Sequence, residues 1–284
     1  MEQPFELSPL THAVGAEVRG LDLAREMGSN TAQALLKALG EHGVLVFRDQ
    51  ELTPEQHLAF SRALAPINVN RFFTPVEGHP EIAEVRKEPE QKTNVGSMWH
   101  TDHSYDAEPA LGSALYAREV PPLGGDTLFA GMYAAFESLS DGLKETLMGL
   151  NAVHGSAHVF GARALAAAGE ERGSRFRNAD QATQEAVHPV VIAHPISGRR
   201  ALYINPQFTL RFEGWTEEES APLLAYLGSV GTRPEHVLRL SWRPGTLALW
   251  DNRATWHQAV NDYHGARRLM HRVTLEGCAL EAAA

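Results

Sequence analysis

The stretch Trp99-His100-Thr101-Asp102 decides the expected architecture of this chain. Successive side chains of an extended segment point to opposite faces, so His100 and Asp102 share one face and can bind one metal ion. A second imidazole, His257, follows 155 residues after Asp102 (257 minus 102). Two histidines and one carboxylate leave coordination positions open and favour non-haem Fe(II). His-x-Asp alone is a weak pattern in a chain with 14 His and 35 acidic residues, so its weight depends on its surroundings.

The composition is that of a globular protein without general affinity for nucleic acid. Apolar residues make up 43% of the 284 residues and charged residues 21%, close to the averages for soluble domains. The formal charge of -10 and the isoelectric point near 5.8 argue against a surface that binds phosphate backbones. We therefore expect no nucleic-acid partner, and a few placed arginines must bind any anion.

Cysteine content and apolar patterning bear on the compartment. Cys278 is the only cysteine, which excludes a disulfide within the chain and a thiolate metal cluster. The first residues lack the basic and apolar segments of a signal peptide, and no apolar run reaches the roughly 18 residues of a membrane span. We expect a cytoplasmic protein that makes no membrane contact.

Short strands dominate the predicted secondary structure, with helices mostly in the first half and near residue 220. The apolar run 44–47 predicts a buried strand, and residues 268–275 predict the last strand. Residues 238–242 and 246–250 are expected to form a hairpin. The absence of a repeat or a composition break favours a single domain over residues 1–284, mainly β with peripheral helices.

One segment is less globular than the rest of this predicted domain. Residues 160–186 contain an alanine run, glycines and alternating charges. Long irregular segments of this kind commonly cover binding sites. We expect a lid or an insertion there.

The run Arg267-Arg268-Leu269-Met270-His271-Arg272 carries two arginines on one strand face. Arg268 and Arg272 follow His257 by 11 and 15 residues, and side chains four apart in a strand share a face. They would present two anion-binding guanidinium groups near the metal. A solvated basic strand would give the same spacing, and His271 could compete as a ligand.

At this point the chain resembles the Fe(II)/2-oxoglutarate-dependent dioxygenases of the taurine dioxygenase and 2,4-D dioxygenase family. The resemblance runs from about residue 8 to 277, and its motifs occur in the order of that family. They are Trp-His-Thr-Asp at 99–102, Gly-Gly-Asp-Thr at 124–127, His-Pro-Val-Val at 188–191, Trp-Asp-Asn-Arg with a later His at 250–257, and Arg-Arg-Leu-Met-His-Arg at 267–272.

The resemblance implies a double-stranded β-helix, a jelly-roll form, and a role for each motif. His100, Asp102 and His257 would hold Fe(II), while Thr127 and Arg268 would bind the distal carboxylate of 2-oxoglutarate. Arg272 would pair with a small anionic substrate. The implied reaction uses O2 to hydroxylate a C–H bond and releases succinate and CO2. Family members commonly form dimers or tetramers, so a homo-oligomer is expected.

The implied substrate wall departs from that of taurine-specific members. Those members carry His and Tyr at the positions of Asn70 and Phe73, and Asn at the position of Gly96. Phe160 and Phe208 match aromatic positions around the substrate, with plain core packing as the alternative explanation. A larger, less polar pocket follows if they face inward. Aryloxyalkanoates, sulfonates and sulfate esters are the candidate substrates.

Two other hypotheses use the same triad. A zinc hydrolase would activate water at the metal, but it gives Arg268 and Thr127 no role. A catalytically inactive jelly-roll binding protein would be expected to have lost a ligand, and none of the three is missing. The dioxygenase is therefore the leading hypothesis.

Overall fold

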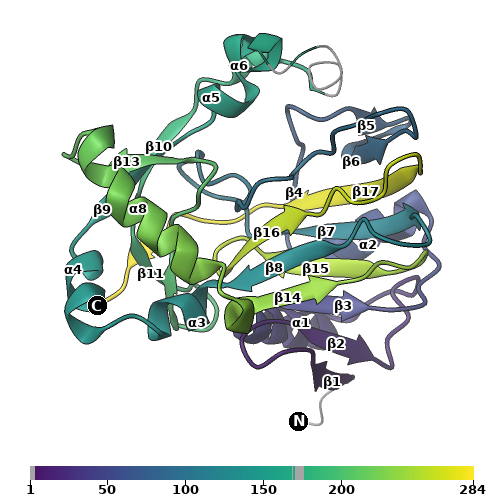
Figure 1. Cartoon of the computed structure of the whole chain (residues 1–284). Helices are drawn as coiled ribbons and strands as arrows, with labels where there is room; N and C mark the ends of the chain where they lie inside the picture. Colours follow the sequence, from purple (N-terminus) through teal and green to yellow (C-terminus); the bar gives the residue numbers. More distant parts are fainter. Residues whose placement is uncertain (1–3, 168, 170–175) are drawn as a thin grey trace.

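The computed structural model describes residues 4–167, 169 and 176–284. Within that part of the chain the protein is mainly β with peripheral helices, as expected (Figure 1). The largest sheet has nine strands, and all its neighbours are antiparallel except β2 and β3, which pair in parallel. Its order is β1 (Glu6–Pro9), β2 (Ala16–Arg19), β3 (Val44–Phe47), β15 (Leu247–Asp251), β7 (Gly112–Glu119), β17 (Arg268–Leu275), β6 (His79–Lys87) and β5 (Pro75–Val76), with β4 (Ile67–Asn68) paired to β17.

Three smaller sheets complete the strand framework among the described residues. Each has three antiparallel strands. They are β14 (Val237–Leu240), β8 (Thr127–Gly131) and β16 (Thr255–Ala259); β10 (Glu185–Pro189), β9 (Asn151–Gly155) and β13 (Thr209–Phe212); and β12 (Arg200–Leu202), β11 (Val191–Ala193) and β18 (Glu281–Ala282).

Alternation along β15 explains how the layers stack. Leu247 and Leu249 point to a core shared with the first helices, whereas Ala248 and Trp250 point to a core shared with β8 and β14. Both faces of β15 are therefore buried, which suits its position between β3 and β7. Helices α1 (Ser29–His42) and α2 (Pro54–Leu64) cover the outer face of the large sheet.

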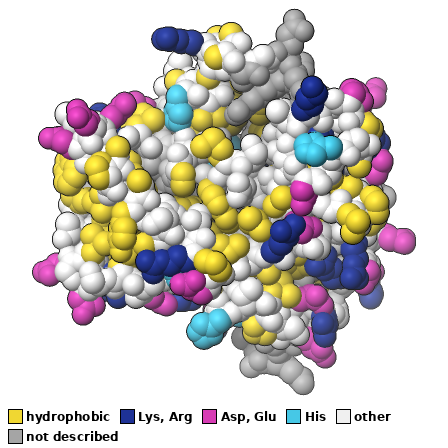
Figure 2. Space-filling view, in the orientation of Figure 1, with side chains coloured by type: hydrophobic (Ala, Val, Ile, Leu, Met, Phe, Trp, Pro, Cys, Tyr) yellow, Lys and Arg dark blue, Asp and Glu magenta, His cyan; other side chains and the backbone are white. Residues whose placement is uncertain are grey.

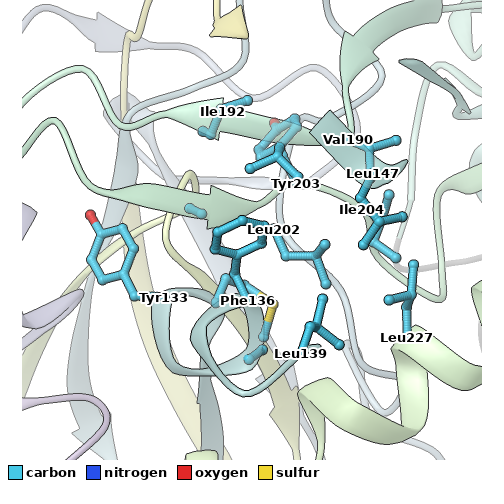
Figure 3. Packing of buried hydrophobic residues seen from close by; sticks show 14 of the residues in the cluster. Tyr133, Phe136, Leu139, Leu147, Val190, Ile192, Leu202, Tyr203, Ile204 and Leu227 are labelled. Atoms are coloured by element: carbon cyan, nitrogen blue, oxygen red, sulfur yellow. The ribbon is translucent and has the colours of Figure 1, made fainter. Parts of the chain in front are cut away.

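The remaining helices surround the smaller sheets. The remaining helices are α3 (Met132–Glu137), α4 (Asp141–Met148), α5 (Ala157–Phe160), α6 (Ala162–Ala167) and α8 (Glu217–Gly231), with 3-10 turns η1 (Ala179–Gln181) and η2 (Pro234–His236). Figure 3 shows the core in which α3 and α8 pack against β11 and β12, with Phe136, Leu202 and Leu227 among its members. No helix in the described ranges is long and apolar enough to span a membrane.

The predicted hairpin through Arg243-Pro244-Gly245 is wrong. Strand β14 pairs with β8, whereas β15 pairs with β3 and β7, so the connection carries the chain from the small sheet to the large one. Gly245 donates its N–H to the Ala117 carbonyl and accepts from the Gln50 N–H. The turn is therefore bonded to segments beside the large sheet, and an apolar pattern on both strands could not reveal which sheet each joins.

Part of the predicted lid segment lies outside the described residues, namely 168 and 170–175. The described part contains the end of α5, then α6, η1 and the start of β10. Helices α5 and α6 lie at the top of Figure 1, and the face of the molecule seen in this orientation carries interspersed acidic and basic side chains (Figure 2). Whether this segment closes over the cavity stays a prediction.

Candidate active site

Two distant motifs meet through their backbones. The His100 N–H donates to the His257 carbonyl at 3.1 Å, and the His257 N–H donates to the His100 carbonyl at 2.7 Å. This reciprocal antiparallel pair places both side chains on one face, with ring centroids 4.1 Å apart. The Thr101 hydroxyl also donates to the Asn252 carbonyl at 2.5 Å. The two motifs are therefore held together independently of any metal.

A buried ion-pair network fixes the turn that leads into β16. Arg253 donates two hydrogen bonds to the Asp251 carboxylate, at 2.9 and 2.7 Å, and His194 Nε2 lies 3.0 Å from the same group. All three side chains are buried. The arginine and histidine satisfy the carboxylate, so the turn that positions His257 keeps one shape.

Asp102 completes the predicted triad. The three donor atoms of His100, Asp102 and His257 lie within 4.8 Å of one another, and all three residues are buried. His100 Nδ1 lies 2.7 Å from the Met98 carbonyl, which can only accept. The proton of the neutral ring therefore sits on Nδ1, and Nε2 turns its lone pair toward Asp102, 3.7 Å away.

The electrostatics keep the triad in its metal-binding protonation state. Burial lowers the pKa of His100, although Asp102 opposes the shift, and burial together with His100 lowers the pKa of His257. Burial alone would raise the pKa of Asp102, but Arg272 and the ligand histidines outweigh it and hold that pKa well below its usual range. Two neutral imidazoles and one carboxylate are the donor set that suits a divalent transition metal.

A buried arginine with unpartnered donors lies beside this triad. Arg268, on β17, is buried, and its Nε and Nη2 atoms have no hydrogen-bond partner. Burial also lowers its pKa, against the attraction of Tyr263 and Asp126. Gly125, in the turn before β8, lies beside the Arg268 side chain and has a φ of 70°, a conformation that favours glycine. A buried guanidinium with free donors is costly unless an anion occupies the site.

Thr127 adds a hydroxyl donor at the start of β8. Its oxygen accepts a hydrogen bond from the Trp242 indole N–H at 2.9 Å. The indole can only donate, so the hydroxyl proton of Thr127 stays available for another acceptor. Trp242 also lies 5.8 Å beneath the Arg268 guanidinium, which links the two donors.

Arg272 faces the triad from the same strand face as Arg268. Its Nη1 donates to Asp102 Oδ2 at 3.1 Å, while its Nε is buried without a partner. Its guanidinium lies 4.4 Å from the centre of the Phe73 ring, which fixes its plane. The Nε N–H is thus a buried donor without a protein partner. His271 points to the other face, where it accepts a hydrogen bond from Arg118, and it is not part of the triad.

One hollow, here called the central cavity, joins all these groups. It encloses about 880 Å³, including the solvent at its mouth, and is bordered by the triad, Thr127 and both arginines. Aromatic and aliphatic side chains form the opposite wall. These include the predicted residues Phe73, Phe160 and Phe208, together with Val85, Val95, Met98 and Phe176.

Asn70 does not border the central cavity. Its Oδ1 accepts the N–H groups of Phe72 and Phe73 at 2.9 and 3.1 Å, and its Nδ2 faces His103 at 3.4 Å. The expectation that Asn70 contacts substrate is therefore not supported by its position. Instead, it shapes the loop that carries Phe73, because a short amide side chain readily caps such a turn.

Several wall residues were missed by the sequence analysis. Met98 and Gln207 lie in irregular segments, and their approach to the cavity depends on the packing of those segments. Phe176 packs edge-on against Phe73 and Phe160, at 5.2 and 5.3 Å between ring centroids. A lone aromatic inside the polar part of residues 160–186 was the available signal, since an aromatic ring contributes a large apolar area when it is buried.

Comparisons with known proteins agree with this geometry. Residues 6–274 match the family described as "Taurine catabolism dioxygenase TauD, TfdA family". An "Alkylsulfatase" from Acinetobacter baylyi is 35% identical, covering 97% of this chain and 86% of that protein. An "Alpha-ketoglutarate-dependent sulfate ester dioxygenase" from Pseudomonas putida is 34% identical, covering 96% and 90%.

A solved structure extends the agreement to three dimensions. A putative alpha-ketoglutarate-dependent taurine dioxygenase from Burkholderia xenovorans superposes with a TM-score of 0.81 at 33% identity, covering 97% of this chain and 94% of that one. The family match spans nearly the whole chain, including every motif of the site. The chain therefore belongs to the taurine catabolism dioxygenase TauD, TfdA family.

Proposed function

We propose that this protein is an Fe(II)- and 2-oxoglutarate-dependent dioxygenase that hydroxylates a C–H bond of a small organic anion and releases succinate and CO2. The observation that carries this function is the buried Arg268, whose Nε and Nη2 have no partner beside a ready-made metal triad. A metal-activated hydrolase would need only the triad. A dicarboxylic co-substrate accounts for both the metal-binding set and the buried guanidinium.

In this proposal His100, Asp102 and His257 hold Fe(II). When bound, the metal supplies the oxygen activation that no side chain can perform. The protein contributes the orientation of the donors: Met98 fixes the His100 tautomer, and Arg272 holds Asp102 Oδ2. The hydrogen bond from Arg272 thereby fixes the orientation of the carboxylate that would bind the metal.

Thr127 and Arg268 would bind the distal carboxylate of 2-oxoglutarate. The Thr127 hydroxyl proton is free because its oxygen already accepts from Trp242. The two unpartnered guanidinium N–H groups suit the parallel oxygens of a carboxylate. The free-energy cost of burying the Arg268 guanidinium is therefore offset only when the co-substrate is bound.

Arg272 would pair with the anionic group of the primary substrate through its free Nε. The opposite wall is aromatic and offers few polar partners, so it favours a substrate whose body is aryl or alkyl. Sulfate esters and aryloxyalkanoates have such bodies, whereas a small amino-sulfonate does not. The wall also excludes water from the reacting carbon.

Succinate release provides the test of this function. The protein would be incubated with Fe(II), ascorbate, 2-oxoglutarate and a panel of sulfate esters, aryloxyalkanoates and sulfonates. Oxygen-dependent succinate above the His100→Ala background is expected with at least one panel member. Activity without oxygen, or no succinate with any anion, would contradict the proposal.

The finer architecture belongs to the same proposal. A double-stranded β-helix is supported by consecutive strands that alternate between sheets, as β14, β15 and β16 do. The single domain over residues 1–284, the lid at 160–186, the homo-oligomer and the cytoplasmic location stay predictions. Size-exclusion chromatography with light scattering would measure the oligomeric state.

A further inference from the structure

A second hollow borders the central cavity at an edge of the large sheet. This edge hollow is bounded by residues 73, 74, 84–86, 88, 91 and 95. It lies where β6 continues past β5, whose pairing to β6 ends at Ala83. Three residues line both hollows, namely Phe73, Val85 and Val95. These three side chains, called the partition below, therefore stand between the two spaces.

The members of the partition are fixed to different degrees. Phe73 lies between the Arg272 guanidinium and Phe176, and Asn70 caps its backbone N–H. Val85 pairs with Met270 of β17, which lies between Arg268 and Arg272, so the sheet fixes its position. Val95 lies in the irregular segment before the first ligand histidine and packs against the aromatic wall. Phe73 is thus part of the anion site, whereas the two valines contribute only volume.

The chemistry of the two hollows differs across the partition. The central cavity presents aromatic rings, whereas the residues that border the edge hollow include the charged Glu84, Arg86 and Glu88. Arg86 lies 3.4 Å from Glu84 and 3.3 Å from Glu88, so these charges already partner one another. An alkyl or aryl group is favoured on the cavity side and meets ion-paired, hydrated groups beyond the valines.

We propose that the partition of Phe73, Val85 and Val95 sets the maximum length of the apolar tail that the primary substrate can place in the central cavity. The inference rests on the proposed function, because it assumes that the central cavity binds an organic anion whose charged group pairs with Arg272. The anion lies beside Phe73, since that ring stacks on the Arg272 guanidinium. A tail that passes Phe73 meets the valines next, and they end the apolar path.

The test measures binding along a series of straight-chain alkyl sulfates, from butyl to dodecyl. Affinities are measured by calorimetry on protein loaded with Fe(II) and 2-oxoglutarate without oxygen, so the result does not depend on turnover. Wild type should gain affinity with each methylene until the partition is reached and then stop gaining. In Val85→Ala and Val95→Ala, affinity should continue to rise by about fourfold for each further methylene that becomes buried.

A matched control comes from the same aromatic cluster. Val159 is also a buried valine of that cluster but borders neither hollow, so Val159→Ala should keep the wild-type chain-length limit. In Val95→Phe, affinity should stop rising at a shorter alkyl chain than in wild type. This variant provides a second test if an alanine variant fails to fold. Circular dichroism melting establishes that each variant is folded.

The outcomes separate the inference from the proposed function. An unchanged limit in Val85→Ala, Val95→Ala and Val95→Phe overturns the inference, as does an equal shift in Val159→Ala or a wild type that binds no alkyl sulfate. Succinate release with any organic anion then still supports the proposed function. A shifted limit without succinate from any anion supports the partition and contradicts the dioxygenase.

Discussion

The two walls of the central cavity are built from different kinds of backbone. Thr127, His257 and Arg268 lie on strands β8, β16 and β17, whose positions are fixed by sheet hydrogen bonds. The facing wall comes mainly from irregular segments and a short helix: Phe73 and Val95 lie in loops, and Phe160 ends α5. In the proposed function the strand wall supplies one metal ligand, the two co-substrate donors and Arg272, whereas His100 and Asp102 come from an isolated bridge and a turn beside it. The loop wall would face the body of the variable substrate.

This difference shows how one scaffold can keep a reaction and change its substrate. A shift of one residue in a strand would turn His257 or Arg268 to the opposite face, so the strand wall tolerates little change. Loops can change length and side chains without breaking a ladder. If the two walls are separable, variants of Thr127, His257 and Arg268 should alter metal or 2-oxoglutarate binding, and variants of the loop wall should alter binding of the primary substrate alone.

The largest effect is expected from His257→Ala. The backbone pair with His100 does not use the imidazole, so the fold should persist while one metal donor is lost. Affinity for Mn(II), measured by electron paramagnetic resonance, should fall by more than about 100-fold, since losing a supporting partner alone costs 10–100-fold. His264→Ala, at an exposed position, is the matched control. Metal affinity within a fewfold of wild type would remove His257 from the site.

Arg268→Met should separate function from stability on the strand wall. The dissociation constant of 2-oxoglutarate should rise by roughly 100-fold, about 3 kcal/mol for a lost charge-assisted contact. The melting temperature should stay level or rise, because a buried charge without a partner has been removed. Calorimetry and thermal melting measure the two quantities. A large loss of stability would mean that Arg268 has an internal role.

Acid should weaken the framework behind the strand wall. His57, on α2, is fully buried, and burial with nearby His271 and Arg118 lowers its pKa to about 3. Burial with Arg118 and His79 lowers the pKa of His271 to about 4. Both values lie below those of the unfolded chain, so the unfolded state binds more protons and stability falls as the pH drops below about 6.5.

Urea unfolding at two pH values measures this effect. Between about pH 7 and about pH 5, the fully buried His57 should lower the free energy of unfolding by about 2 kcal/mol. His57→Gln keeps a donor for the Ala114 carbonyl but cannot titrate, so its pH dependence should be smaller than that of wild type. An unchanged dependence in this variant would exclude His57 as the source.

The smallest effect is expected from Phe176→Leu on the loop wall. Phe176 contacts two wall rings, and each aromatic contact contributes about 1 kcal/mol. The KM for the primary substrate should rise by roughly tenfold, whereas the dissociation constant of 2-oxoglutarate should not change. Steady-state kinetics and calorimetry measure the two. Equal losses in both would mean that the walls are not separable.

The same difference explains what the sequence could predict. The shared face of Arg268 and Arg272 follows from the strand period. His100 and Asp102 lie in a bridge and a turn instead of a strand, and the structure still brings all four side chains to one cavity. The position of Phe176 depends on how an irregular segment packs, which no short-range pattern encodes. Asn70 was misplaced for the same reason: a polar residue near the site can face its own loop instead of the cavity.

The reciprocal backbone pair of His100 and His257 also has a consequence for folding. Its two residues are 157 positions apart (257 minus 100), so closing the pair joins the middle of the chain to its last strands. Contacts of such long range carry a high loop-closure entropy and form late. During synthesis, the nascent chain has no complete ion-binding set until β16 has emerged. We therefore expect metal uptake to be a late step in the maturation of this protein, so that tight ion binding would report that the sheets have closed.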